Sequence, residues 1–115
     1  MAEFLTINIK DNMQAVDVAI AEFLIALESA KKQKTKALKI VHGYGSHGVG
    51  GKILLELKRI LPQMKRRGEI KDYISGADWK YSNPKVFDFI TNVAPDAARD
   101  EDMNKANIGV TIVVI

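Results

Sequence analysis

Five of the eight glycines of this chain, and both of its histidines, fall within residues 40–52, IVHGYGSHGVGGK. An apolar run precedes this stretch, and apolar residues at helical spacing follow it. Glycine has no Cβ, so a loop of this composition can adopt positive φ angles and bring backbone N–H groups close to a ligand. Such a loop, placed between a strand and the N-terminus of a helix, can hold an anion. The stretch therefore predicts a strand, an anion-binding loop and a helix.

The hydrophobic pattern extends this unit in both directions. Runs rich in strand formers alternate with stretches whose apolar residues recur at helical spacing. Strands are predicted at residues 4–10, 37–41, 69–75 and 108–115, and helices at residues 14–32 and from about 51 to 64. Pro62 should end the second helix near Leu61 or kink it there, because its nitrogen has no hydrogen to donate. The almost wholly apolar last strand suits either a central strand covered on both faces or an edge strand protected by a partner.

This β-α-β-α-β-β order predicts one domain over residues 1–115, of the α/β class. We expect an α+β two-layer sandwich, in which a four-stranded mixed sheet carries two helices on one face. Residues 76–107 form an inserted segment before the last strand. Within it, Asn83 and Pro84 predict the cap and first turn of a short helix. Residues 92–105 are expected to form a surface loop, and Trp79 and Tyr81 to pack in the core or against the loop.

The charge distribution and the lack of cysteine indicate which classes of partner and which compartment suit this chain. Residues 1–85 carry 15 Lys and Arg against 9 Asp and Glu, whereas residues 86–115 carry 2 against 5. A basic segment that contains the glycine loop suits an anionic partner such as nucleic acid. The absence of cysteine excludes disulfides and thiolate metal sites and fits a reducing compartment. No signal-peptide pattern and no apolar run of about 20 residues is present, so we expect a cytoplasmic protein with no membrane partner.

Two common phosphate-binding motifs come close to the loop without fitting it. Residues 43–48 match G-x-G-x-x-G, but the dinucleotide fingerprint also needs an acidic residue at the end of the next strand. Glu69 lies at the start of that predicted strand. A Walker loop needs Ser or Thr after its Gly-Lys pair, whereas Lys52 is followed by Ile53. Neither motif therefore accounts for the loop.

Residues 40–45, IVHGYG, with the glycines that follow, resemble the His-Gly-x-Gly signature of the small MutS-related (Smr) domain family. Residues 109–113, GVTIV, resemble the last strand of that family, and the resemblance covers roughly residues 5–75 and 107–115. It implies a fold like the C-terminal domain of translation initiation factor 3. It also implies nucleic-acid binding and, in many members, nicking of DNA or cleavage of RNA. Where the family commonly has a histidine after its first strand, this chain has Lys10.

The leading hypothesis is a domain that binds DNA or RNA through contacts of glycine loop 43–51 with the phosphate backbone. The expected contact residues are His42, Gly43, Tyr44, Gly45, Ser46, His47, Gly48, Gly50, Gly51, Lys52 and Lys10. Two alternatives stay open: an endonuclease, and a small-anion or protein-interaction module. In the endonuclease, His42 would serve as acid, base or phosphate ligand, and a divalent metal would be admissible; otherwise no cofactor or metal is predicted.

Two further hypotheses concern neighbouring residues. His42 could instead be a structural residue that holds the glycine loop in place. The cations Lys65, Arg66 and Arg67 could extend the electrostatic track for a nucleic-acid backbone. The oligomeric state is left open by the sequence.

Overall fold

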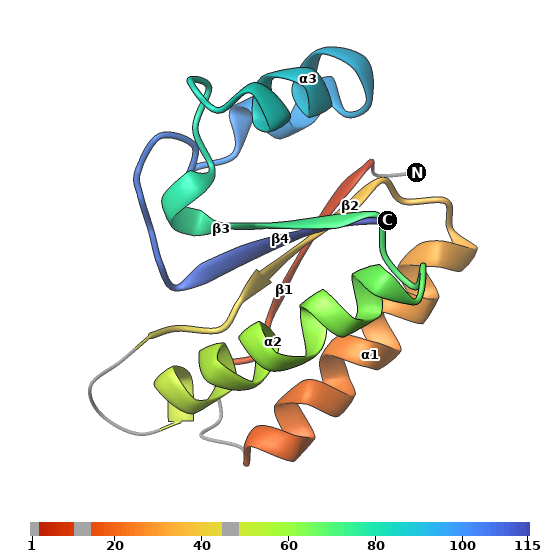
Figure 1. The fold of residues 1–115 in the computed structure, drawn as a ribbon, viewed down its shortest axis with the longest axis vertical. Coiled ribbons are helices and arrows are strands. Elements are labelled where there is room, and N and C mark those ends of the chain that lie inside the picture. Colours follow the sequence, from red (N-terminus) through yellow and green to blue (C-terminus); the bar gives the residue numbers. More distant parts are fainter. Residues whose placement is uncertain (1–2, 11–14, 45–48) are drawn as a thin grey trace.

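The structure is a computed structural model that describes residues 3–10, 15–44 and 49–115. Strands and helices follow the predicted order, with a third α-helix and two short 3-10 helices between the last two strands (Figure 1). The elements are β1 (Phe4–Asn8), α1 (Val16–Lys32), β2 (Ala37–Val41), α2 (Val49–Arg66), β3 (Asp72–Ser75), η2 (Gly76–Asp78), α3 (Pro84–Asn92), η3 (Pro95–Arg99) and β4 (Val110–Val114). The predicted class, a four-stranded mixed sheet with two helices packed on one face, is confirmed.

The sheet has the strand order β1-β2-β4-β3. β1 and β2 are parallel, whereas β4 is antiparallel to both β2 and β3. The register pairs Val41 at the end of β2 with Asn8 at the end of β1 and with Val110 at the start of β4. The glycine-rich segment therefore begins at one end of the sheet, where the end of β2 lies between the end of β1 and the start of β4.

Helices α1 and α2 cover one face of the sheet (Figure 1). Their apolar faces bury residues such as Phe23 and Leu57 against the sheet residues Leu38 and Val113. α2 continues past Pro62 to Arg66, so of the two outcomes predicted at Pro62, an end near Leu61 or a kink, the end near Leu61 is ruled out. The residues on either side of the proline, Leu61 and Met64, are both buried, and this packing holds the last turns of the helix in place.

The inserted segment covers the opposite face of the sheet (Figure 1). Trp79 is fully buried, and its ring stacks on that of Phe4 with 5.8 Å between the centroids. Ala94, Ala97 and Met103 are also buried, so the surface loop expected at residues 92–105 is wrong. This segment shows no extended periodic pattern, because its buried residues lie in a short 3-10 helix and in the connections on either side of it.

Two predictions about this half of the fold are confirmed. The side chain of Asn83 caps α3 by accepting a hydrogen bond of 3.0 Å from the backbone N–H of Lys85. β4 is a central strand, and its residues Val110, Thr111, Ile112 and Val113 are all buried. Its apolar sequence therefore reflects cover on both faces of the sheet.

Candidate functional site

The start of the glycine-rich segment is fixed to the sheet by backbone contacts. The N–H groups of His42 and Gly43 both donate to the carbonyl oxygen of Gly109, at 3.0 Å each. Gly43 has a φ of 75°, a conformation that side chains disfavour and glycine tolerates. The chain therefore turns away from β2 at Gly43, directly beside the start of β4.

Gly109 lies on the other side of this turn, and space there is restricted. A Cβ at Gly109 would lie 3.0 Å from Cδ1 of Tyr44 and 3.1 Å from Oδ1 of Asn107. The same Cβ would lie 3.4 Å from Cα of Gly43. The two glycines thus allow the loop and the start of β4 to approach closely.

The structure places His42 inside the protein, where none of its surface is exposed. Nδ1 lies 2.6 Å from the carbonyl oxygen of Gly43, and Nε2 lies 2.9 Å from Oγ1 of Thr111. Since a carbonyl oxygen can only accept, Nδ1 carries the proton and Nε2 can accept from the threonine hydroxyl. Burial lowers the pKa of His42, against the opposing effect of the Gly43 carbonyl. This geometry favours a neutral, structural histidine that holds the loop.

We expect His42 to make the free energy of unfolding fall as the pH drops below about 6.5, the pKa of an unperturbed histidine. Its pKa is lowered in the folded state, so the unfolded chain takes up a proton first. The stability contributed by the neutral ring is then complete above the unfolded pKa of about 6.5 and declines below it, by at most ~1.4 kcal/mol per pH unit. Urea unfolding at several pH values measures the decline. His42→Gln, which cannot titrate, should show a shallower one, and equal slopes would contradict the assignment.

The exposed residues at this edge are those that can meet a ligand. Tyr44 is 58% exposed, and Lys10 and Lys52 are also exposed. Lys10 follows β1, whose last contact with β2 is the 2.9 Å hydrogen bond from the N–H of Ile9 to the carbonyl of Val41. Both lysines and the tyrosine therefore belong to the same end of the sheet.

The helix that follows the loop begins earlier than predicted. α2 starts at Val49, so Gly50 and Gly51 belong to its first turn, together with Lys52. The first N–H groups of a helix have no partner within it and carry the positive end of the helix dipole. The first turn of α2 contains no acidic residue. The remaining predicted contacts, Gly45, Ser46, His47 and Gly48, lie outside the described residues.

Lys58 is a cation that the sequence analysis did not single out. It lies near enough to His42 to contribute to lowering the pKa of that ring. It also lines a small hollow of about 130 Å³ together with Thr111, the partner of the His42 ring. The sequence held no signal for it, because six residues separate Lys58 from Lys52 and this spacing does not place two side chains on one helix face.

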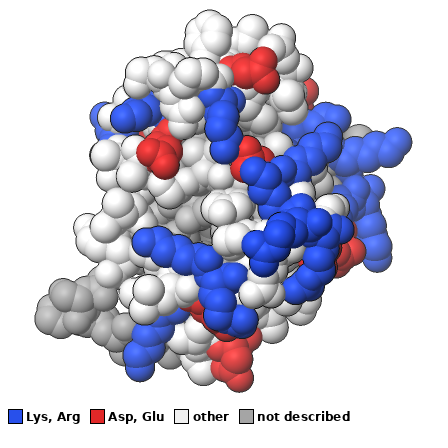
Figure 2. Space-filling view, in the orientation of Figure 1, with Lys and Arg blue, Asp and Glu red and all other residues white. Residues whose placement is uncertain are grey.

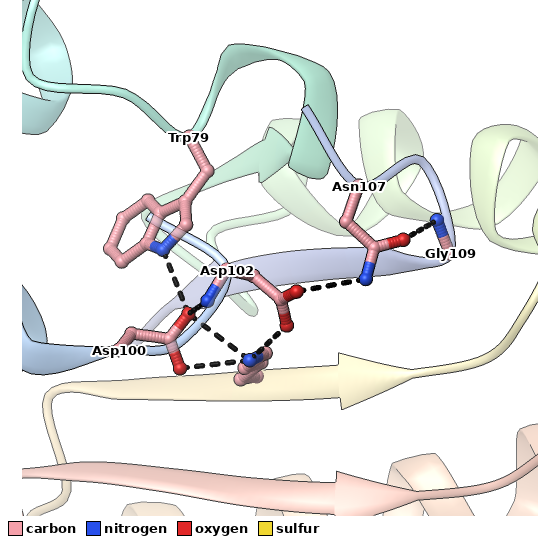
Figure 3. Close-up of polar contacts among 6 residues, drawn as sticks. Trp79, Asp100, Asp102, Asn107 and Gly109 are labelled. Atoms are coloured by element: carbon pink, nitrogen blue, oxygen red, sulfur yellow. Dashed lines mark hydrogen bonds and ion pairs between the residues drawn. The ribbon is translucent and has the colours of Figure 1, made fainter. Parts of the chain in front are cut away.

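A cluster of buried charged residues lies on the face of the sheet that the inserted segment covers. Lys39 is 2% exposed, and its Nζ lies 2.8 and 3.1 Å from the two carboxylate oxygens of Asp100 and 2.5 Å from Oδ2 of Asp102. Nε1 of Trp79 donates to Asp100 at 3.0 Å (Figure 3). We name Lys39, Asp100, Asp102 and Trp79 the buried charge cluster. It was missed because Lys39 stands in an apolar run and the acidic residues were assigned to a loop.

Hydrogen bonds join the buried charge cluster to the turn at Gly43 and Gly109, which we name the glycine turn. Asp102 accepts a bond of 2.9 Å from Nδ2 of Asn107, whose Oδ1 accepts one of 2.9 Å from the N–H of Gly109 (Figure 3). Burial opposes the ionisation of Asp102, yet the bonds from Asn107 and Lys39 outweigh it and lower the pKa of Asp102. In the same way, burial is outweighed by Asp100 and Asp102, which raise the pKa of Lys39. The ionised cluster thus fixes the position of the turn.

The predicted extension of the site along α2 does not reach the glycine turn. Lys65 and Arg66 belong to the last turn of this 18-residue helix, roughly 20–25 Å from its first turn at 1.5 Å per residue. Figure 2 shows that many Lys and Arg side chains gather on the side of the molecule where α1 and α2 end. These cations form a separate surface.

Comparisons with family models, curated proteins and solved structures found no match. Membership of the Smr family thus stays a prediction that depends on the sequence pattern of residues 40–51 and 109–113. Within the described part of the chain, no three histidine, aspartate or glutamate side chains are grouped so that they could hold a metal ion. None of the helices there combines the length and apolar composition that a membrane crossing requires.

Proposed function

We propose that this domain binds nucleic acid through the phosphate backbone, with Lys10 and residues of the glycine-rich segment 43–52 as its contacts. The observation that carries the proposal is the first turn of α2, in which Lys52 is exposed, no residue is acidic, and the leading N–H groups have no partner within the helix itself. A phosphate group suits such a position because the helix dipole and the lysine both favour negative charge. The exposed ring of Tyr44, next to Gly109, offers a surface on which an unpaired base can stack.

Binding, and not cleavage, is the activity that this geometry supports. His42 was the predicted acid or base of the nuclease alternative, and both of its ring nitrogens are occupied by Gly43 and Thr111. A buried ring with a lowered pKa is a poor proton donor near neutral pH. We assign His42 to holding the turn and Lys10, Tyr44 and Lys52 to contacting the ligand. We place this activity in the cytoplasm, in keeping with a chain that lacks cysteine.

Fluorescence anisotropy with labelled single-stranded and duplex oligonucleotides tests the proposal. Affinity should fall steeply with salt, because each phosphate contact releases a counterion. The double variant Lys10→Gln/Lys52→Gln should reduce the slope of log K against log salt by about two units. Lys80→Gln/Lys105→Gln removes the same charge from exposed positions on the inserted segment and should leave the slope near the wild-type value. Absence of binding at low salt would reject the proposal, as would equal losses in both double variants.

A further inference from the structure

A second candidate site lies at the opposite end of the sheet from the glycine turn. A hollow of about 420 Å³ opens where α1 and α2 end and where the chain enters β2 and β3. We name it the lysine hollow. It is lined by Lys31, Lys34, Thr35, Lys36, Gly68, Glu69, Ile70, Lys71 and Ile115. This is the side of the molecule where Figure 2 shows the dense group of Lys and Arg side chains.

The charge of the lysine hollow exceeds what the local structure requires. Its side chains include four lysines, of which Lys31 lies 3.7 Å from Glu28, and one carboxylate, that of Glu69, which lies 3.5 Å from Arg67. Lys34, Lys36 and Lys71 form no ion pair with any residue in the described ranges. Lysines commonly complement the negative ends of helices, but two helix ends amount to only about one unit of charge. The surplus of positive charge therefore needs another explanation.

Thr35, which stands between two of these lysines, gives an independent indication of a ligand. It is 3% exposed, and its Oγ1 is the buried side-chain atom for which no hydrogen-bond partner is found in the described part of the chain. Buried hydroxyl groups are normally paired, because an unpaired one loses its bonds to water without replacement. The backbone N–H groups of residues 34–36 are already used within the protein. The group without a hydrogen-bond partner is therefore the hydroxyl of Thr35, a residue that lines the hollow.

The backbone at Lys34 also departs from what stability alone favours. α1 and α2 end in the same way: the residue after the last turn has a positive φ, and two backbone bonds reach back into the helix. At the end of α2 this residue is Gly68, with a φ of 76°, whereas at the end of α1 it is Lys34, with a φ of 59°. Glycine is the residue that this conformation prefers. A lysine there keeps a charge at the hollow at the cost of backbone strain.

We propose that the lysine hollow binds a phosphate group, with the ammonium groups of Lys34, Lys36 and Lys71 and the hydroxyl of Thr35 as its contacts. This inference is independent of the proposed binding at residues 43–52, because the two sites lie at opposite ends of β2. The phosphate group belongs either to a small phosphorylated compound or to a nucleic-acid backbone. Both present the same oxygens to the lysines.

Titration of ¹⁵N-labelled protein with pyrophosphate, followed by backbone amide shifts, tests this proposal. We expect saturable shifts at residues 31–36 and 68–71, at least tenfold weaker binding in Lys36→Gln/Lys71→Gln, and at least threefold weaker binding in Thr35→Val. Lys80→Gln/Lys105→Gln should bind as the wild type does. Shifts that are absent, or that persist unchanged in both hollow variants, would overturn the proposal. Amides near residues 43–52 report separately on the other site.

Two additional measurements distinguish the two sources of the phosphate group, and a binding role of Lys34 from a structural one. If a single-stranded oligonucleotide shifts the same amides and competes with pyrophosphate, the ligand is a nucleic-acid backbone; if only pyrophosphate does so, it is a small phosphorylated compound. Lys34→Gly should raise the urea midpoint of unfolding while weakening pyrophosphate binding. A lysine with a purely structural role would give the opposite result, with a lower midpoint and unchanged binding, and this would overturn the assignment of Lys34.

Discussion

Replacing Lys39 with methionine is expected to lower the free energy of unfolding by roughly 3–5 kcal/mol. The substitution keeps an unbranched side chain, shorter by one atom, and removes its charge. It leaves the carboxylates of Asp100 and Asp102, whose side chains are 7% and 15% exposed, without their cation. Since small domains are stable by only about 5–15 kcal/mol, much of the population could unfold. Urea denaturation followed by circular dichroism measures the loss.

A matched variant and a rescue separate this effect from the general cost of losing a lysine. Lys80→Met removes an exposed lysine and should change the free energy of unfolding by no more than about 0.5 kcal/mol. Lys39→Met/Asp100→Asn/Asp102→Asn removes all three charges together and should recover roughly half of the loss, because no unpaired buried charge remains. A loss below about 1 kcal/mol for Lys39→Met would show that the cluster is not held as ions in the folded protein.

The buried charge cluster marks the limit of what the sequence could predict. Strand and helix spacing identified the main elements, and the apolar run of β4 predicted a central position, because these patterns depend on neighbours along the chain. Lys39 was hidden within such a run. Its partners Asp100 and Asp102 lie about sixty residues away, in a segment with no periodicity. A lysine at a core-facing position of a strand was the one available signal that a distant carboxylate packs above it.

The glycine turn was predicted in position, while the role of its histidine was left between two hypotheses. The sequence could identify a strand, a glycine loop and a helix, since each has a local pattern. Whether the His42 ring faces solvent depends on Thr111 and Gly109, which are contributed by the last strand. Residues 40–52 alone do not show that β2 pairs with a strand almost seventy residues later in the chain. The structure supplies this pairing and places the ring inside the protein.

Gly76→Ala is expected to destabilise the protein by about 3 kcal/mol, because an added methyl group has no room. The new Cβ would lie 1.7 Å from the carbonyl oxygen of Asn107 and 2.9 Å from Cγ2 of Val110. The nearest obstacle is backbone, so the connection into β4 has to move. Asn107 also holds the N–H of Gly109, so amide shifts at Gly43 and Gly109 should change with it. Urea unfolding gives the free energy and NMR gives the shifts.

Gly68→Ala provides the control, because it separates crowding from backbone strain. Gly68 has a positive φ of 76°, and a Cβ there would meet nothing within 4 Å. Its replacement should cost about 1 kcal/mol from the left-handed conformation alone and should leave the amides of the glycine turn unchanged. If Gly76→Ala lowers the free energy of unfolding by no more than Gly68→Ala does, the backbone of Asn107 is not packed tightly against Gly76. If it costs more and also shifts Gly43, that segment positions the turn that we propose contacts nucleic acid.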